Sequence, residues 1–188
     1  MDFVLALHSH LPYVLNHGRW PHGSDWLCEA ALDTYLPLLE TFDRLGAAGV
    51  PAPVTIGFTP VLANQLVDPG FGREMDAFFA QRLVACDEAT KALPATGGDS
   101  LLPLVAFWKD RFGTLQERFH RIDRNIVTAF RKLEQEGRLE IIGSAATHGY
   151  LPLLGRDESI RLQLAVGKGE TSRWRWFVPG NENVSRPG

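Results

Sequence analysis

The sequence is poor in cysteine, in basic charge and in long apolar runs. Its 188 residues include two cysteines, Cys28 and Cys86, which form no CxxC pair, so we expect buried free thiols on helices and no disulfide scaffold. The formal net charge of −3 argues against a nucleic-acid partner, because phosphate binding needs a basic patch. No apolar run approaches the roughly 18 residues of a membrane span, and no signal peptide follows Met1. We therefore expect no membrane partner and a cytoplasmic location.

Common motifs of catalysis and nucleotide binding are missing as well. The chain contains no GxSxG, no Walker-type glycine loop and no GxGxxG. The sequence analysis therefore depends on histidines, aromatic residues and carboxylates, and on where the predicted strands place them.

Apolar runs and helical periods alternate along the chain, which indicates parallel βα units and an α/β fold. The predicted strands, continuous apolar runs typical of strands buried on both faces, are Phe3–Leu7, Pro53–Phe58 and Leu139–Gly143. The predicted helices are Trp26–Leu45, Val61–Val67, Arg73–Leu93, Leu102–Glu136 in two pieces broken near Gly113, and a helix starting at Asp157–Val166; Asp68–Gly72 is predicted to be a turn and Gly137 a helix cap.

Histidines stand at the ends of two predicted strands. His8 and His10 follow the first strand, Thr59 follows the second, and His148 follows the third. Because a parallel barrel builds its site at the carboxyl ends of its strands, we expect the three histidines to be neighbours. They are compatible with a shared metal ion, with hydrogen bonds at the strand ends, or with substrate contact. A metal site needs further ligands, and the later strand ends offer only Thr59 and His148.

An aromatic loop follows the first strand. Tyr13, Trp20 and Trp26 are interleaved with His22 and Asp25. An indole face suits the CH-rich face of a pyranose ring, while imidazole and carboxylate groups bond sugar hydroxyls. The alternative is that the tryptophans pack the loop, and that Trp26 belongs to the core.

Glycoside cleavage requires two carboxylates, and the sequence offers no convincing pair. Ser24-Asp25 before a predicted helix is typical of an N-cap, which we favour for Asp25. Glu140 lies within the third strand, where it either pairs with Arg138 or faces a helix.

Four separated motifs resemble glycoside hydrolase family 57, in particular the N-terminal part of its 1,4-α-glucan branching enzymes. They are "ALHSHLPYV" (6–14), "HGRWPHGSDWLCEAALDTYLPLL" (17–39), "IGFTPVLANQL" (56–66) and "EIIGSAATHGYLPLL" (140–154). The resemblance implies the N-terminal portion of an incomplete (β/α)7 TIM-like barrel. It also implies retaining glycosyl transfer from an α-1,4-glucan such as amylose, starch or glycogen to a glucan 6-hydroxyl, without a metal or other cofactor.

The resemblance also implies site residues. His10 and His148 would line the donor-sugar subsite with His8 beside them, and Trp20 and Trp26 would contribute to the glucan-binding surface. The family's nucleophilic glutamate would fall at the last residues or just past them. Glu182 is the nearest carboxylate there and a weak candidate, because its sequence context differs from the family's. The acid/base aspartate would lie beyond residue 188.

The last 22 residues look foreign to this pattern, since the apolar period stops after Val166. We predict a family domain over 1–166 and a divergent tail over 167–188, produced by truncation or a frameshift, or belonging to a divergent short protein. Three hypotheses about function follow: an inactive fragment of a branching enzyme, a metal-dependent hydrolase using the three histidines, and a non-catalytic α-glucan-binding module.

Overall fold

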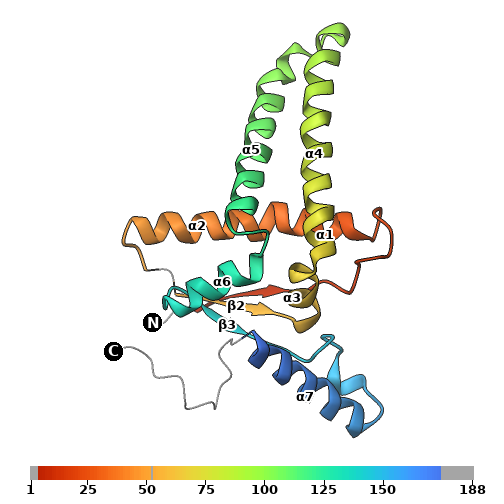
Figure 1. Ribbon diagram of the computed structural model, residues 1–188, viewed down its shortest axis with the longest axis vertical. Helices are drawn as coiled ribbons and strands as arrows, with labels where there is room; N and C mark the ends of the chain where they lie inside the picture. The colour runs from red at the N-terminus through yellow and green to blue at the C-terminus, as the bar shows by residue number, and fades with distance from the viewer. Residues whose placement is uncertain (1–3, 52, 175–188) are drawn as a thin grey trace. The chain divides into compact units, whose positions relative to one another are not determined.

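Figure 1 shows a computed structural model that describes residues 4–51 and 53–174. The chain divides into two units. Of the described residues, unit 1 comprises 4–13, 40–51, 53–66 and 127–174, and unit 2 comprises 14–39 and 67–126. Unit 1 therefore gathers three distant segments of the chain, and these segments carry all three predicted strands.

A three-stranded parallel sheet forms the centre of unit 1, with β2 (Val54–Phe58) between β1 (Leu5–Ser9) and β3 (Glu140–Ile142) (Figure 1). The register aligns Leu7 with Ile56, and Ile56 with Ile141. The predicted α/β fold with parallel strands is confirmed. All three strands overlap the predicted apolar runs, although β1 extends two residues beyond its predicted end, to Ser9.

The two faces of the sheet differ in burial. Ile56, Phe58 and Ile141 are at most 1% exposed, and the Phe58 ring lies 5.1 Å from that of Phe130 on α6 (Ile126–Gln135). Ile142, on the opposite face, is 39% exposed. Leu5 shares the face of Ile56 but is 40% exposed, so the expectation that the first strand is buried on both faces is wrong. The reason is position: β1 has a neighbouring strand on one side only in the described sheet.

The predicted helix at Trp26–Leu45 consists of three consecutive segments. These are α1 (Ser24–Ala30), a π-helical turn η1 (Ala31–Tyr35) and α2 (Leu36–Ala47). The wide turn directly precedes Pro37, which has no N–H to donate to the preceding turn. The helix ends before Gly49, whose φ of +65° allows the chain to turn back.

In unit 2, α4 (Pro69–Ala92) and α5 (Leu102–Arg121) form a long antiparallel hairpin joined by the short 3-10 turns η2 (Pro94–Thr96) and η3 (Asp99–Leu101) (Figure 1). Rings of Phe71 and Phe79 lie 5.9 Å and 6.2 Å from the ring of Phe119. The predicted turn at Asp68–Gly72 is wrong beyond its first residue: Asp68 caps α4 by accepting from the Gly70 N–H at 2.6 Å.

The predicted break near Gly113 is also wrong, because α5 continues to Arg121 and the chain turns at 122–125. A glycine inside a helix costs only about 1 kcal/mol relative to alanine, which this helix tolerates. The actual turn contains Asp123 and Arg124, both with positive φ. The Asp76 carboxylate holds it, accepting hydrogen bonds at 2.8 Å from His120 and from Arg124.

Beyond β3, η4 (Leu151–Leu153) leads to α7 (Asp157–Arg173), which extends seven residues past Val166. The helix thus continues past the residue at which its apolar period stops. Polar contacts hold α7 instead of an apolar stripe: Asn64 of α3 (Pro60–Val67) donates to Glu170 at 3.2 Å. The division at 166 remains a prediction, and Glu182 lies outside the described residues.

Both cysteines are buried free thiols, Cys28 on α1 and Cys86 on α4, as predicted. Burial, followed by the nearby Asp25, raises the pKa of the Cys28 thiol to about 12. Gly137, with a φ of +69°, ends α6 as expected. Among the helices of the described part of the chain, none combines the length and the hydropathy needed to cross a bilayer.

Candidate functional site

The three histidines meet at the carboxyl end of the sheet in unit 1. The ring centroid of His148 lies 4.7 Å from that of His8 and 4.6 Å from that of His10, and His8 and His10 are 6.4 Å apart. His8 belongs to β1, His10 follows it, and His148 comes from the loop after β3. The predicted proximity of residues about 140 positions apart is confirmed, because parallel strands deliver their following loops to one edge.

The first histidine loop is anchored by the turn between β2 and α3. The Thr59 hydroxyl lies 3.2 Å from His10 Nδ1, and the Thr59 N–H donates to the Ser9 carbonyl at 3.3 Å. Further along α3, Gln65 donates to the Pro12 carbonyl at 3.0 Å. Thr59 and Gln65 are 1% and 0% exposed, so these bonds are shielded from water. These bonds hold the chain at Ser9 and at Pro12, on either side of His10.

The second histidine loop is anchored on α7. Gln163 accepts from the Thr147 N–H at 3.0 Å through its side chain and from the Ala146 N–H at 3.0 Å through its carbonyl. Gln163 also donates to the Thr147 hydroxyl at 2.9 Å. His148 has a φ of +58°, a left-handed conformation that is uncommon for a residue with a side chain. Strained backbone of this kind is typical of functional sites.

The environment of the cluster favours neutral imidazoles. Burial, followed by the neighbouring His148 and His8, lowers the pKa of His10 below its usual value. Burial and then His8 lower the pKa of His148 in the same direction. A neutral imidazole offers one N–H donor and one nitrogen acceptor, which suits a sugar hydroxyl that can both accept and donate.

The geometry does not support the metal interpretation of these histidines. Within residues 4–51 and 53–174, no group of three His, Cys, Asp or Glu side chains is arranged to hold a metal ion. The rings pack against one another with interplanar angles of 30–42°, and Nδ1 of His10 is already bonded to Thr59. The arrangement instead presents imidazole edges for hydrogen bonding.

In the aromatic loop, Tyr13 belongs to unit 1, and Trp20 and Trp26 belong to unit 2. Trp20 is 76% exposed and Trp26 is 39% exposed, so neither is a core residue. The Trp26 ring packs edge-on against His22, with 5.7 Å between centroids. The N-cap favoured for Asp25 is wrong: α1 begins at Ser24, and Asp25 instead accepts from Arg19 at 2.9 Å.

The pairings expected for Glu140 also differ. Glu140 accepts from the Thr55 hydroxyl at 2.8 Å across the β2–β3 pair. Arg138 instead donates to Glu136 at 3.2 Å and to the carbonyl of Phe42. The side chain of Glu140 thus ties two strands together on the exposed face of the sheet.

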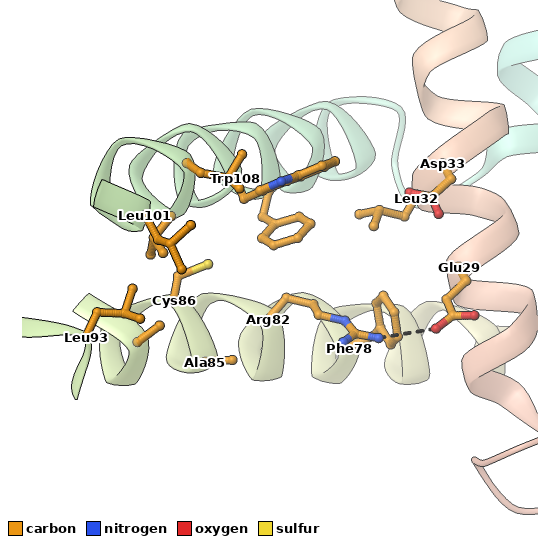
Figure 2. Close-up of a pocket in the computed structure, with 14 residues that line it drawn as sticks. Glu29, Leu32, Asp33, Phe78, Arg82, Ala85, Cys86, Leu93, Leu101 and Trp108 are labelled. Carbon is orange, nitrogen blue, oxygen red and sulfur yellow. Dashed lines mark hydrogen bonds and ion pairs between the residues drawn. The ribbon is translucent and has the colours of Figure 1, made fainter. Parts of the chain in front are cut away.

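Unit 2 also contains an apolar groove of about 520 Å³. Figure 2 shows Trp108 of α5 and Leu101 of η3 facing Cys86 and the neighbouring side chains of α4, with Glu29 at one end. Glu29 pairs with Arg82 at 3.3 Å. The groove lining is largely apolar and includes none of the predicted binding residues, so its chemistry does not suit a hydroxyl-rich sugar.

Comparison with known proteins decides the family. The model of glycosyl hydrolase family 57 matches residues 4–172. The chain belongs to glycosyl hydrolase family 57. It is 37% identical to the 1,4-alpha-glucan branching enzyme TK1436 of Thermococcus kodakarensis, over 98% of this chain and 30% of that protein.

Solved structures agree with this membership. The branching enzyme of Pyrococcus horikoshii matches with a TM-score of 0.86 at 40% identity, covering 91% of this chain and 32% of its own. The α-amylase AmyC of Thermotoga maritima matches with a TM-score of 0.82 at 26% identity, with the same coverage. The chain thus spans about a third of the length of the proteins it matches.

Sequence reasoning placed the histidines correctly but missed their supports. The bonds of Gln65 and Gln163 carry no sequence signal, because a glutamine on a predicted helix is ordinarily solvated. Thr59 was noticeable only as a polar residue at a strand end, and its bond to His10 depends on the register of β1 against β2.

Proposed function

We propose that the described residues form the donor-sugar part of an α-glucan site in an enzyme of the branching type. The observation that carries this proposal is the cluster of His8, His10 and His148 at the carboxyl end of the sheet, with lowered pKa values for two of them. Membership of family 57 and the names of the two branching-enzyme relatives support α-glucan as the substrate class.

In this proposal each residue has a distinct role. His10 and His148 hydrogen-bond hydroxyls of the donor glucose, and His8 packs beside them. Trp20 and Trp26 offer indole faces to the glucan chain, consistent with their exposure. The whole enzyme would build this site on an incomplete (β/α)7 barrel, of which the three parallel strands are the first part.

The proposal assigns binding, and not bond cleavage, to the described residues. The resemblance puts the nucleophilic glutamate and the acid/base aspartate at or after the last residues of this sequence, and Glu182 remains a weak candidate nucleophile. In the whole enzyme the glutamate would attack the anomeric carbon and the aspartate would protonate the leaving oxygen. A glucan 6-hydroxyl would then accept the glycosyl group.

Titration calorimetry with maltoheptaose tests the proposal. We expect the 188-residue chain to bind, and His10→Ala or Trp20→Ala to weaken binding about 5- to 10-fold, since an aromatic contact or a hydrogen bond is worth about 1 kcal/mol. Trp108→Ala is the control, because Trp108 is also an exposed tryptophan, at 42% against 76% for Trp20, but lines the apolar groove. Absence of binding at millimolar maltoheptaose would contradict the proposal.

The iodine colour of amylose separates binding from turnover. We expect the chain to bind amylose without loss of iodine colour, because no carboxylate among the described residues is assigned a catalytic role. Branching would lower the colour without releasing reducing sugar, whereas hydrolysis of the α-amylase kind would release it. Either result would contradict the assignment of binding alone.

A further inference from the structure

Thr59 lies in the turn after the middle strand, β2. Among the hydrogen bonds of the described residues, it is the one residue of this turn whose side chain contacts a site histidine. Its hydroxyl lies 3.2 Å from His10 Nδ1, and its side chain is almost completely buried at 1% exposure. An N-cap threonine ordinarily turns its hydroxyl to the first turn of its own helix. Here the hydroxyl bonds to the histidine of another strand's loop.

The backbone of the same turn makes this use of the hydroxyl possible. Pro60, the first residue of α3, has no N–H that requires a cap. The next N–H, that of Val61, donates to the Ala146 carbonyl at 3.2 Å, and the Thr59 carbonyl accepts from the Ala63 N–H at 3.0 Å. The N–H groups of Val61 and Ala63 therefore have partners without the threonine side chain.

We propose that Thr59 is a positioning residue that engages Nδ1 of His10 and so reserves Nε2 for the sugar. This inference deepens the proposed function and rests on it. A hydroxyl can donate or accept, so the bond fixes the plane of the ring in either tautomer. With Nδ1 occupied, His10 meets a glucose hydroxyl through Nε2 and needs no reorientation when the ligand arrives.

The turn that carries Thr59 also reaches the second loop. Val61 holds Ala146, which lies two residues before His148, while Thr59 holds Ser9 and His10. The spacing between His10 and His148, 4.6 Å between ring centroids, thus depends on adjacent bonds from one short segment. A change of the Thr59 side chain should affect His10 first, because the Val61 and Ala63 bonds are backbone bonds that the change leaves intact.

The experiment uses ¹⁵N-histidine spectra and maltoheptaose titrations of the 188-residue chain. Thr59→Val removes the hydroxyl at nearly constant shape, and Thr59→Ser retains it. Thr55→Val is the control on the strand that precedes Thr59, since the Thr55 hydroxyl bonds Glu140. We expect Thr59→Val alone to shift the Nδ1 resonance of His10 and to weaken maltoheptaose binding about 2- to 10-fold. In the unaltered chain, maltoheptaose should shift Nε2 of His10 more than Nδ1.

An unchanged His10 spectrum in Thr59→Val would overturn the positioning role, as would a ligand shift centred on Nδ1. Equal loss of binding in Thr55→Val and Thr59→Val would also overturn it, because the effect would then reflect general destabilisation. If the unaltered chain bound no maltoheptaose, the proposed function would fail, while the Nδ1 comparison would still decide the role of Thr59. If Thr59→Val did not fold, Thr59→Ala would replace it, and an unchanged Nδ1 resonance of His10 in that variant would overturn the proposal.

Discussion

Gly167→Ala should destabilise unit 1, because α7 packs its backbone directly against the loop that carries His148. A Cβ built at Gly167 would lie 2.3 Å from the Ser144 carbonyl oxygen and 3.1 Å from the Ala146 nitrogen. Ordinary carbon–oxygen contact requires more than 3 Å, so helix and loop would have to separate by roughly 1 Å. The obstacle is backbone and cannot rotate away.

The magnitude follows from two opposed effects. Overpacking a well-filled site costs about 1–3 kcal/mol, and a clash with backbone belongs to the upper part of that range. Replacing a helical glycine by alanine stabilises by about 1 kcal/mol through propensity. The expected net loss is about 1–2 kcal/mol in the free energy of unfolding. His148 should move with its loop, because the bonds of Gln163 to Ala146 and Thr147 transmit the displacement.

Gly169→Ala provides the matched control, since it lies two residues away on the same exposed helix and a Cβ there meets nothing within 4 Å. Gly169→Ala should therefore show only the gain of about 1 kcal/mol from helix propensity. The free energies of unfolding of the two variants in urea should therefore differ by about 2–3 kcal/mol, and their melting temperatures by about 4–12 °C for a chain of this size. Equal midpoints for the two alanine variants would refute the close approach of α7 to the 144–146 backbone.

Two further predictions concern protonation. The pKa values of His10 and His148 in the folded chain lie below the usual 6.5, so between the folded values and pH 6.5 the unfolded chain binds more protons. The stability that His10 and His148 contribute is therefore complete above pH 6.5 and is lost as the pH falls. Urea midpoints at pH 7.5 and 5.5 measure this loss. Replacing both histidines by Gln should make the urea midpoint less dependent on pH. A thiol with a pKa of about 12 is almost entirely protonated at pH 8, so iodoacetamide should leave Cys28 unmodified in the folded chain and alkylate it in urea, as mass spectrometry would detect. Rapid alkylation of Cys28 without denaturant would contradict its burial.

Elements whose determinants are local were predictable from the sequence. The strand β2 is an apolar run bounded by proline and threonine-proline, and the glycines at 49 and 137 end helices through their positive φ. The proximity of His10 and His148 also followed, because it requires only that the strands be parallel and that residues after them share an edge.

Elements determined by distant residues were not predictable. The turn at 122–125 depends on Asp76, a carboxylate on another helix, and no glycine marks it. The C-terminal half of α7 has no apolar period, because Gly167 and Asn64 fix it through close backbone contact and a hydrogen bond. Hydrophobic periodicity indicates the burial of side chains, so it gives no signal where contacts of the backbone hold a helix in place.

The difference between local and distant determinants also explains why the site histidines can be recognised in the sequence, while the residues that hold them in place cannot. A histidine after a strand is noticeable by itself, whereas Thr59 gains its role only when β2 pairs in register with β1 and brings its hydroxyl to Nδ1 of His10. Since β2 is the middle strand, its turn is the one segment next to both histidine loops in the described sheet. Thr59 bonds the first loop from this turn and Val61 bonds the second, which a turn after an edge strand could not do. Positioning residues in a parallel sheet should therefore be sought after the middle strand, even where the residues that contact the ligand follow its neighbours.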